Sequence, residues 1–375
     1  MIKEYIENNT KELYGLIYDL CRIPAPSHNE GKRAEYIKAW FDKNGIEDAY
    51  IDEALNVVLP YGAKDSQELT VFAAHTDTVF PDTEPMPYSD DGEYIRCPGV
   101  GDNTASLAVL MLTAKYFVEK DIKTNGVLFV ANSCEEGLGD LKGVRKLFSD
   151  YEGRIAKFIA FDSFNLTRCS DRCVGSRRYE VEAITEGGHS YNAFGNKNAI
   201  AELSSIVGKI YSTELPEKEG RRVTYNVGEI CGGTSVNTIA QSAKMLCEYR
   251  SDDEELLAFM KARFERIFDE AKSEKVKINV RLIGERPCAG KVDEAEMENL
   301  KKIASRALLE VTGEELKFTS SSTDCNIPLS LGIPAICIGV YNGYGAHTRE
   351  ESVEKSSLIK GFEIGLKAAV DFACQ

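Results

Sequence analysis

Short apolar runs of strand length alternate with helical segments in the first part of the chain. Three such runs are LTVFAAHTDTV (69–79), GVLFVANSC (126–134) and KFIAFDSF (157–164). Between the first two, apolar side chains recur on one face of a predicted helix over residues 104–119. Buried strands that alternate with helices predict an α/β domain, with a mixed but mostly parallel sheet flanked by helices. Functional side chains are then expected at the carboxyl ends of the strands.

The pattern changes between about residues 174 and 289, where four strands accompany two helices. The strands are YEVEAITEG, VTYNVGEICGG, AKMLCEYRS and KVKINVRLIGE, and the helices cover 198–212 and 252–271. The order β-α-β-β-α-β is that of a ferredoxin-like α+β unit. A helix over 292–310, the run IPAICIGV (333–340) and a helix over 351–373 then return to the first pattern. We therefore predict one domain of residues 1–173 and 290–375, interrupted by an inserted domain of residues 174–289.

The charge balance limits the partners of the chain. Its 375 residues include 45 Lys and Arg against 60 Asp and Glu, a net charge of −15, which argues against a nucleic-acid or anionic-membrane partner. The first 20 residues form a charged amphipathic pattern without a signal peptide's apolar segment, and no run approaches the about 18 apolar residues of a transmembrane helix. Eleven scattered cysteines indicate reduced thiols. We expect a soluble cytoplasmic protein.

Imidazole and carboxylate side chains stand where apolar runs end or next to a Gly-rich turn. These candidates are His75, Asp102, Glu135, Glu136, Asp162 and His347. Together they form a ligand set suited to Zn²⁺, with Mn²⁺ or Co²⁺ as alternatives. Taken singly, each also has an ordinary structural explanation; Asp102, for example, precedes a helix and could be its N-cap.

Six short motifs occur in an order that resembles a known family. HTDTV, GVGDNTA, CEEGLG, FDS, GGHS and AHTREES span nearly the whole chain, including the predicted inserted domain. They resemble the co-catalytic di-zinc exopeptidase and deacylase family, which includes peptidase T, carboxypeptidase G, aminoacylase, acetylornithine deacetylase and the carnosine dipeptidases. The motifs look most like those of peptidase T and related aminopeptidases.

The resemblance implies two Zn²⁺ ions per chain, held by five side chains of the 1–173 and 290–375 domain. One aspartate would bridge the ions and each ion would have two further ligands: Asp102 as the bridge, His75 and Asp162 at one ion, and Glu136 and His347 at the other. Two ions about 3.5–4 Å apart can hold a hydroxide between them and polarise a scissile carbonyl.

The resemblance also implies roles for residues around these ligands. Glu135 would act first as general base and then as general acid. Asp77 would accept a hydrogen bond from the imidazole of His75 and so select its tautomer. The peptide bond between Asp102 and Asn103 would be cis.

In the inserted domain the resemblance points to three residues. His189, in TEGGHSYN, would stabilise the tetrahedral oxyanion, often from the other subunit of a homodimer formed through this domain. Asn237 and Arg250 match positions that hold a substrate carboxylate or the reacting carbonyl. Alternatively, Arg250 pairs with a neighbouring acid, Asp252 or Asp253. Outside the inserted domain, SSSTDCNIPLSLGIP (320–334) resembles the family's turn into a short helix that lines the substrate pocket, with Asp324 and Asn326 as weaker candidates.

Three functions remain open from the sequence. The first is a metal-dependent exopeptidase of short peptides, a di- or tripeptide aminopeptidase. The second is a deacylase of N-acyl amino acids or related small amides, which would use the same metal chemistry. A non-catalytic metal-binding relative is disfavoured because all five ligand positions and Glu135 are present.

Overall fold

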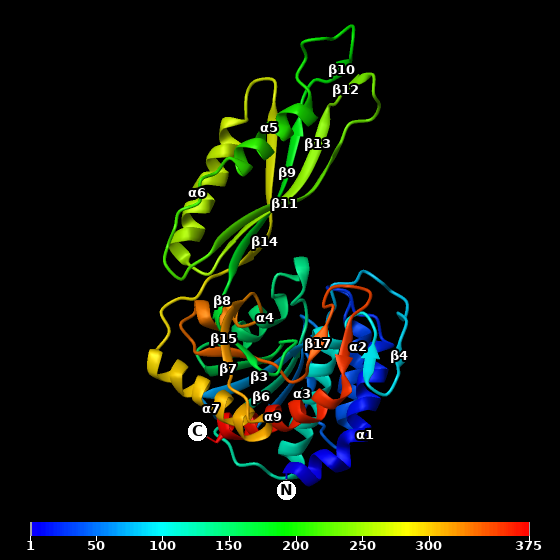
Figure 1. Cartoon of the computed structure of the whole chain (residues 1–375), viewed down its shortest axis with the longest axis vertical. Coiled ribbons are helices and arrows are strands. Elements are labelled where there is room, and N and C mark those ends of the chain that lie inside the picture. Colours follow the sequence, from blue (N-terminus) through cyan, green and yellow to red (C-terminus); the bar gives the residue numbers. More distant parts are fainter. Residues whose placement is uncertain (1, 375) are drawn as a thin grey trace. The chain divides into compact units, whose positions relative to one another are not determined.

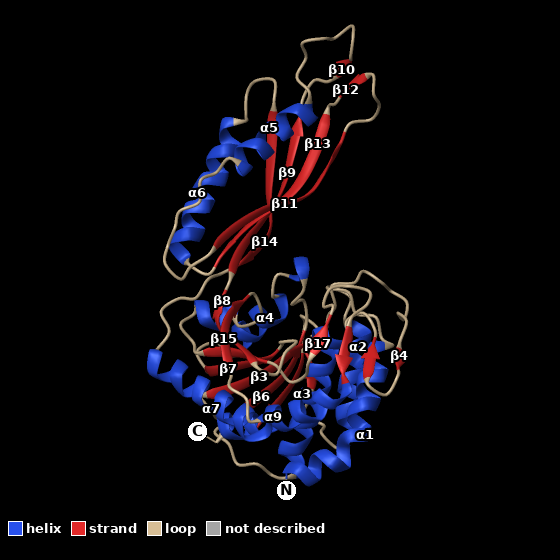
Figure 2. Ribbon diagram, viewed as in Figure 1, coloured by secondary structure: helices blue, strands red, loops and turns tan. Residues whose placement is uncertain are grey.

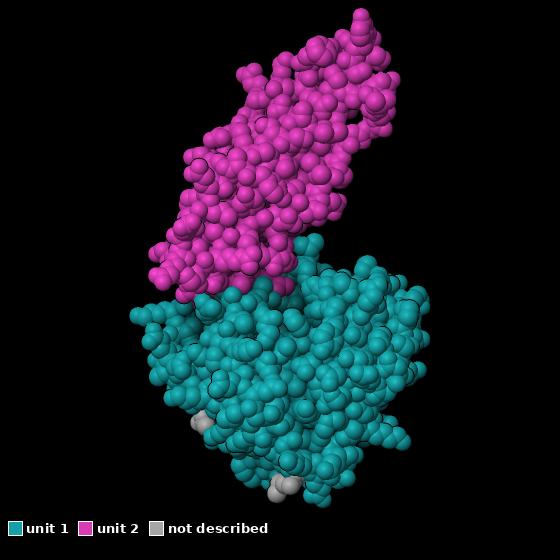
Figure 3. All heavy atoms as spheres, viewed as in Figure 1, with its two compact units in different colours: residues 1–173, 290–375 teal, residues 174–289 magenta. Residues whose placement is uncertain are grey.

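A computed structural model describes residues 2–374, which divide into two compact units (Figure 3). Unit 1 contains the described residues up to Cys173 and those from Gly290 onward, and unit 2 is Val174–Ala289. Each unit has buried apolar clusters of its own. The two units are therefore described separately.

Unit 1 is built on a mixed sheet of eight strands (Figure 1). Its inner strands β6, β3, β7 and β16 run parallel to one another, and antiparallel pairs flank them on both sides. In spatial order the strands are β1 (Tyr50–Ile51), β2 (Val57–Tyr61), β6 (Val127–Asn132), β3 (Leu69–His75), β7 (Ile155–Phe161), β16 (Ala335–Ile338), β8 (Arg168–Cys173) and β15 (Lys317–Ser321). The predicted, mostly parallel sheet is confirmed.

Helices cover both faces of this sheet (Figure 2). Alternate side chains of β3 serve opposite faces, as the twofold period of a strand requires: Phe72 and Ala74 join one apolar cluster, Val71 and Ala73 the other. The first cluster includes α1 (Ile2–Cys21), α2 (Gly31–Lys43), α3 (Ser106–Glu119), α7 (Glu294–Thr312) and α9 (Lys355–Ala373). The second includes the shorter α4 (Lys142–Asp150) and α8 (Asn326–Ser330). Burial on both faces explains why these strands are continuously apolar.

A second, small sheet in unit 1 is absent from the sequence-based prediction. Its strands are β17 (Gly343–Tyr344), β18 (Ser352–Glu354), β5 (Tyr94–Arg96) and β4 (Ser89–Asp90). Because residues 352–354 pair with β5, the last helix begins at Lys355 rather than at residue 351. Strands of two or three residues are too short for a period, which is why the sequence does not reveal them.

Unit 2 has the predicted ferredoxin-like order. Its antiparallel sheet runs β11 (Val223–Gly232), β13 (Ser242–Ser251), β9 (Gly175–Ile184) and β14 (Lys277–Arg286). The helices α5 (Ala199–Tyr211) and α6 (Glu254–Glu270) contribute to the same apolar cluster as the sheet. Side chains of Asn198 and Asp253 cap their first turns. A short pair, β10 (Gly188–His189) and β12 (Thr238–Ile239), completes the unit.

Of the helices within residues 2–374, none combines the length and the apolar character that crossing a lipid bilayer requires.

Adjacent leucines in α7 provide a test of this packing. Leu308 is fully buried, whereas Leu309 is 53% exposed. We expect Leu308→Ala to lower the free energy of unfolding by about 2–5 kcal/mol, because it leaves a cavity in the core. Leu309→Ala should change it by less than about 0.5 kcal/mol. Denaturant unfolding followed by fluorescence of Trp40, which lies in the core of unit 1, measures both. Equal losses would contradict the packing.

Candidate metal centre

The carboxyl ends of three neighbouring strands bring polar side chains to one edge of the unit 1 sheet. His75 is the last residue of β3, Asp162 directly follows β7, and Glu135 and Glu136 follow β6. These strands are adjacent and parallel in the order β6-β3-β7, so their carboxyl ends coincide. The predicted residues therefore lie at the edge where an α/β sheet presents functional groups.

Asp102 lies between two histidines. Its Oδ1 is 2.9 Å from Nε2 of His75, and its Oδ2 is 3.1 Å from Nε2 of His347. Asp102 belongs to a π-helical turn, Val100–Ala105, that precedes α3, and Ala105 is the N-cap of that helix. The N-cap explanation of Asp102 is therefore wrong. Its peptide bond to Asn103 is cis, which confirms the expectation from the resemblance.

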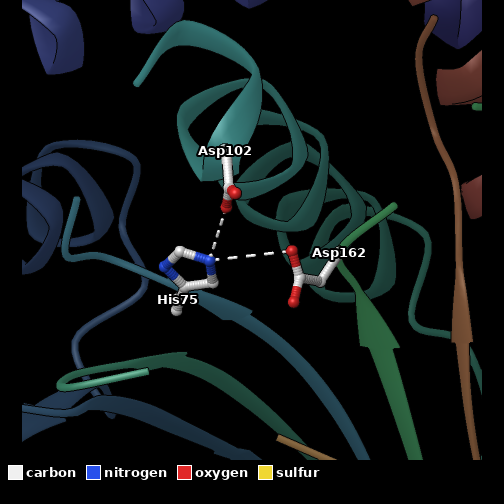
Figure 4. A group of neighbouring side chains, drawn as sticks. All are labelled: His75, Asp102 and Asp162. Atoms are coloured by element: carbon white, nitrogen blue, oxygen red, sulfur yellow. Dashed lines mark hydrogen bonds and ion pairs between the residues drawn. The ribbon is translucent and has the colours of Figure 1, made fainter. Parts of the chain in front are cut away.

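Two groups of possible metal ligands share Asp102. One is His75, Asp102 and Asp162, in which Nε2 of His75 is 3.6 Å from Oδ1 of Asp162 (Figure 4). The other is Asp102, Glu136 and His347, in which Nε2 of His347 is 3.1 Å from Oε1 of Glu136. In each group the ligand atoms lie within 4.8 Å of one another. A carboxylate with one oxygen in each group is what a dinuclear centre needs.

A third combination, His75 with Glu135 and Glu136, meets the same distance limit. Geometry alone therefore also permits Glu135 as a ligand. Unlike Glu136, however, Glu135 shares no ligand group with Asp102 among residues 2–374.

The electrostatics of the centre fit a bound cation. Burial, reinforced by the charge of Asp102, raises the pKa of Glu136 to about 7, and burial likewise raises the pKa of Asp162 to about 7. Within the described residues, the buried Oε1 of Glu136 makes no hydrogen bond, although Nε2 of His347 is nearby. Buried carboxylates are costly unless they are paired or coordinate a metal. The imidazole and carboxylate side chains, with this oxygen of Glu136 that makes no hydrogen bond within residues 2–374, therefore fit divalent ions.

Asp77 connects His75 to the glutamate pair. Its carboxylate accepts hydrogen bonds from the main-chain N–H groups of Glu135 (3.0 Å) and Glu136 (2.9 Å) and from the hydroxyl of Ser27 (2.7 Å). Nδ1 of His75 lies 3.0 Å from the main-chain oxygen of Asp77 and 3.3 Å from its Oδ1. Since neither oxygen can donate, Nδ1 carries the proton and Nε2 presents a lone pair toward Asp102. The sequence does not reveal the bonds to the glutamate amides or to Ser27, because no local signal joins segments so far apart.

Asn132 and Asp324 form a buried polar pair. The amide of Asn132, the last residue of β6, donates to Oδ2 of Asp324 at 2.7 Å, and both side chains are fully buried. Asn326 has a structural contact, since its Oδ1 accepts a hydrogen bond from the main-chain N–H of Thr323.

In unit 2, His189 is exposed and its tautomer is set by the backbone. Its Nδ1 accepts hydrogen bonds from the main-chain N–H groups of Tyr191 (3.2 Å) and Asn192 (3.4 Å). The neutral ring therefore carries its proton on Nε2. Asn237 lies beside it, because its main-chain oxygen accepts a bond from the N–H of Ser190.

Arg250 forms a two-pronged ion pair with Glu248, at 2.7 and 3.0 Å. The alternative partners suggested by the sequence are therefore wrong, and Asp253 instead caps α6. In a strand, residues two apart point to the same face, and this explains the pairing of 248 with 250.

Comparison with known proteins gives the family. Residues 71–371 match the model of peptidase family M20/M25/M40, and the chain belongs to this family. It resembles the crystal structure of a tripeptidase from Staphylococcus aureus with a TM-score of 0.77 and 21% identity, over 97% of this chain and 99% of that one. For aminopeptidase PepT from Bacillus cereus the TM-score is 0.74, with 20% identity over 97% and 99%. The succinyl-diaminopimelate desuccinylase of Corynebacterium glutamicum is 24% identical over 342 residues, 88% of this chain and 89% of that protein.

Family membership makes the chain a hydrolase of the metallopeptidase and amidohydrolase type. Dinuclear metal binding is a property of this family, and the His, Asp and Glu cluster described above agrees with it.

Metal analysis tests the centre directly. We expect protein purified without chelator to carry about two transition-metal ions per chain. Asp102→Asn should weaken the binding of both ions, because each group loses its shared carboxylate oxygen. An exposed aspartate, replaced in Asp121→Asn, is the matched control and should leave binding unchanged. Elemental analysis and Co²⁺ titration measure the result, and full binding by Asp102→Asn would contradict a shared ligand.

Proposed function

We propose that this protein is an exopeptidase that removes the amino-terminal residue from di- and tripeptides, with Glu135 as the proton carrier beside a dinuclear metal centre. The observation that carries the proposal is the adjacency of Glu135 to two ligand groups that share Asp102. Glu135 is 5% exposed, and its main-chain N–H is bonded to Asp77. A buried carboxylate in this position has little solvent competing for its proton.

The proposed ligands are Asp102 as the bridge, His75 and Asp162 on one side, and Glu136 and His347 on the other. Two Zn²⁺ ions, or Mn²⁺ or Co²⁺, would supply Lewis acidity that lowers the pKa of a water molecule and polarises the scissile carbonyl. Asp77 supports this arrangement because its main-chain oxygen accepts the hydrogen bond from Nδ1 of His75. The lone pair of Nε2 is then free for a ligand bond.

Glu135 moves the proton through the reaction. It takes a proton from the water molecule as the water oxygen attacks the carbonyl carbon. It then gives this proton to the amide nitrogen as the carbon–nitrogen bond breaks, so that the amine leaves neutral and the new carboxylic acid remains. One residue thus acts first as general base and then as general acid.

Unit 2 would complete the site within a homodimer. We assign His189 as the donor to the oxyanion of the tetrahedral intermediate, because its Nε2 carries a proton when the ring is neutral. Asn237 and Arg250 would hold the reacting carbonyl or a substrate carboxylate. The long strands β11 and β14 are the edges of the unit 2 sheet, and such edges can pair with a second copy.

A second candidate, favoured by the similarity to the desuccinylase, is a deacylase of N-acyl amino acids. Both reactions break an amide bond with the same side chains. They differ in the group on the acyl side of that bond, which carries a free α-amine in an aminopeptidase substrate and is a neutral or acidic acyl group in a deacylase substrate.

Adjacent substitutions separate the proposed proton carrier from the proposed ligand. We expect Glu135→Gln to lower kcat by about 10²–10⁴-fold while both ions remain bound, since an amide cannot accept the proton. Glu136→Gln should instead lose metal, because a charged ligand is replaced by a neutral one. Metal content and single-turnover rates measure both variants. Near-normal turnover by Glu135→Gln would remove Glu135 from this role.

A substrate panel separates the two candidate functions. We expect free di- and tripeptides to be cleaved at the amino-terminal bond, and the same peptides with a blocked amine to be cleaved poorly or not at all. Mass spectrometry of the products identifies the bond. Hydrolysis of N-succinyl or N-acetyl amino acids alone would favour the deacylase and overturn the aminopeptidase proposal.

A further inference from the structure

Glu351 is a buried carboxylate that contacts the turn carrying Asp102. It is 2% exposed, and its Oε2 accepts a hydrogen bond of 2.8 Å from the main-chain N–H of Gly99. Its Oε1 accepts two more, each of 2.8 Å, from the N–H groups of Gly101 and Asp102. Both oxygens are thus used by the backbone, and Glu351 belongs to none of the ligand groups found among the described residues.

The turn is shaped to receive this carboxylate. Gly99 has a φ of +78°, in the left-handed region that glycine favours. A Cβ on Gly101 would lie 3.0 Å from Oε1 of Glu351 and 3.0 Å from the ring of Tyr341, so little room is left on that side. Successive main-chain N–H groups that point at one anion form an anion-binding concavity. Here the anion is a side chain of the protein itself.

Glu351 also belongs to the segment that carries His347. It lies four residues after His347 and immediately before β18, and its main-chain oxygen accepts a hydrogen bond from the N–H of Cys97. The next residue, Ser352, pairs with Arg96 of β5. The side chain of Glu351 therefore joins the loop of His347 to the turn of Asp102, and its main chain joins the same loop to Cys97, just before that turn.

The two ligand groups depend on this junction to different extents. In the Asp102, Glu136 and His347 group, two of the three residues stand on segments that Glu351 connects. In the other group His75 and Asp162 stand at the ends of β3 and β7, and only Asp102 is held by Glu351. The His347 side should therefore respond more strongly when the connection is lost.

We propose that Glu351 is a positioning residue that sets Asp102 and His347 relative to each other and thereby determines the affinity of the His347-side ion. This inference rests on the proposed ligand roles, and it assigns to Glu351 no contact with metal or substrate. Partners that orient ligands in this way typically contribute about 10–100-fold to metal affinity.

Glu351→Gln tests the proposal, because its amide keeps the shape of the side chain but turns an N–H group toward one of the backbone N–H donors. We expect Co²⁺ titration of the chelator-treated variant to show affinity lowered by about 10–100-fold for one class of ion and by a smaller factor for the other. His347→Ala identifies the affected class, since it should abolish the same titration step. Glu350→Gln, which removes the exposed neighbouring carboxylate, is the matched control and should titrate as the wild type does.

A second variant disturbs the same contact at the turn instead of at Glu351. Gly101→Ala places a methyl group against the carboxylate of Glu351 and should weaken the same class of ion while Glu351 itself remains. Near-UV circular dichroism and denaturant unfolding in the presence of chelator establish that each variant is folded before metal is added.

The outcomes distinguish this inference from the proposal on which it rests. If wild-type protein binds two ions and both variants, folded, bind both with unchanged affinity, Glu351 is only structural and the inference is overturned. Equal weakening of the two ions also overturns it. If the wild type binds no ion, the metal centre itself is wrong and the inference falls with it.

Discussion

The cost of burying negative charge governs how the centre of unit 1 is built. Asp102, Glu135, Glu136 and Asp162 approach one another at the edge of a sheet, where the imidazoles of His75 and His347 also lie. Burial raises the pKa of Glu136 and Asp162, whereas Asp102, despite its burial, keeps a lowered pKa because the imidazoles of His347 and His75 lie 3.1 and 2.9 Å from its two oxygens. Divalent cations would offset the remaining repulsion. The adjacent glutamates are therefore compatible with each other as parts of a metal-dependent hydrolase.

Two further carboxylates, those of Asp77 and Glu351, hold the backbone of this region by hydrogen bonds. Among the described residues neither belongs to a ligand group that contains Asp102. The carboxylate of Asp77 accepts hydrogen bonds from the main-chain N–H groups of Glu135 and Glu136. The carboxylate of Glu351 accepts them from the N–H groups of Gly99, Gly101 and Asp102. In both cases a buried anion organises backbone that carries functional side chains, and each backbone donor in turn stabilises the anion. The hydrogen bonds that hold this backbone thus join segments far apart in the sequence, 58 residues between Asp77 and Glu135 and 249 between Asp102 and Glu351.

The general fold is predictable because buried apolar side chains recur along the sequence with the period of the helix or strand that carries them. Val71 and Ala73 face one apolar cluster and Phe72 and Ala74 the other, which yields the continuous apolar runs of a sheet covered on both faces. The same reasoning predicts the ferredoxin-like order of unit 2. It does not predict the small sheet of β4, β5, β17 and β18, whose strands are too short to show a period and are held by pairing between segments about 250 residues apart in the chain.

The sequence by itself determined the α/β class, the family and the identity of the polar residues that end the strands, because local periodicity and short motifs carry that information. Only the tertiary structure decided that the two oxygens of Asp102 face different histidines, that Arg250 pairs with Glu248, and that Glu351 lies under the turn of Asp102. Those contacts join residues through the packing of turns and loops, and a turn's direction depends on hydrogen bonds to distant segments. Side-chain identity is a local property, whereas the direction in which a carboxylate oxygen points is a property of the folded chain.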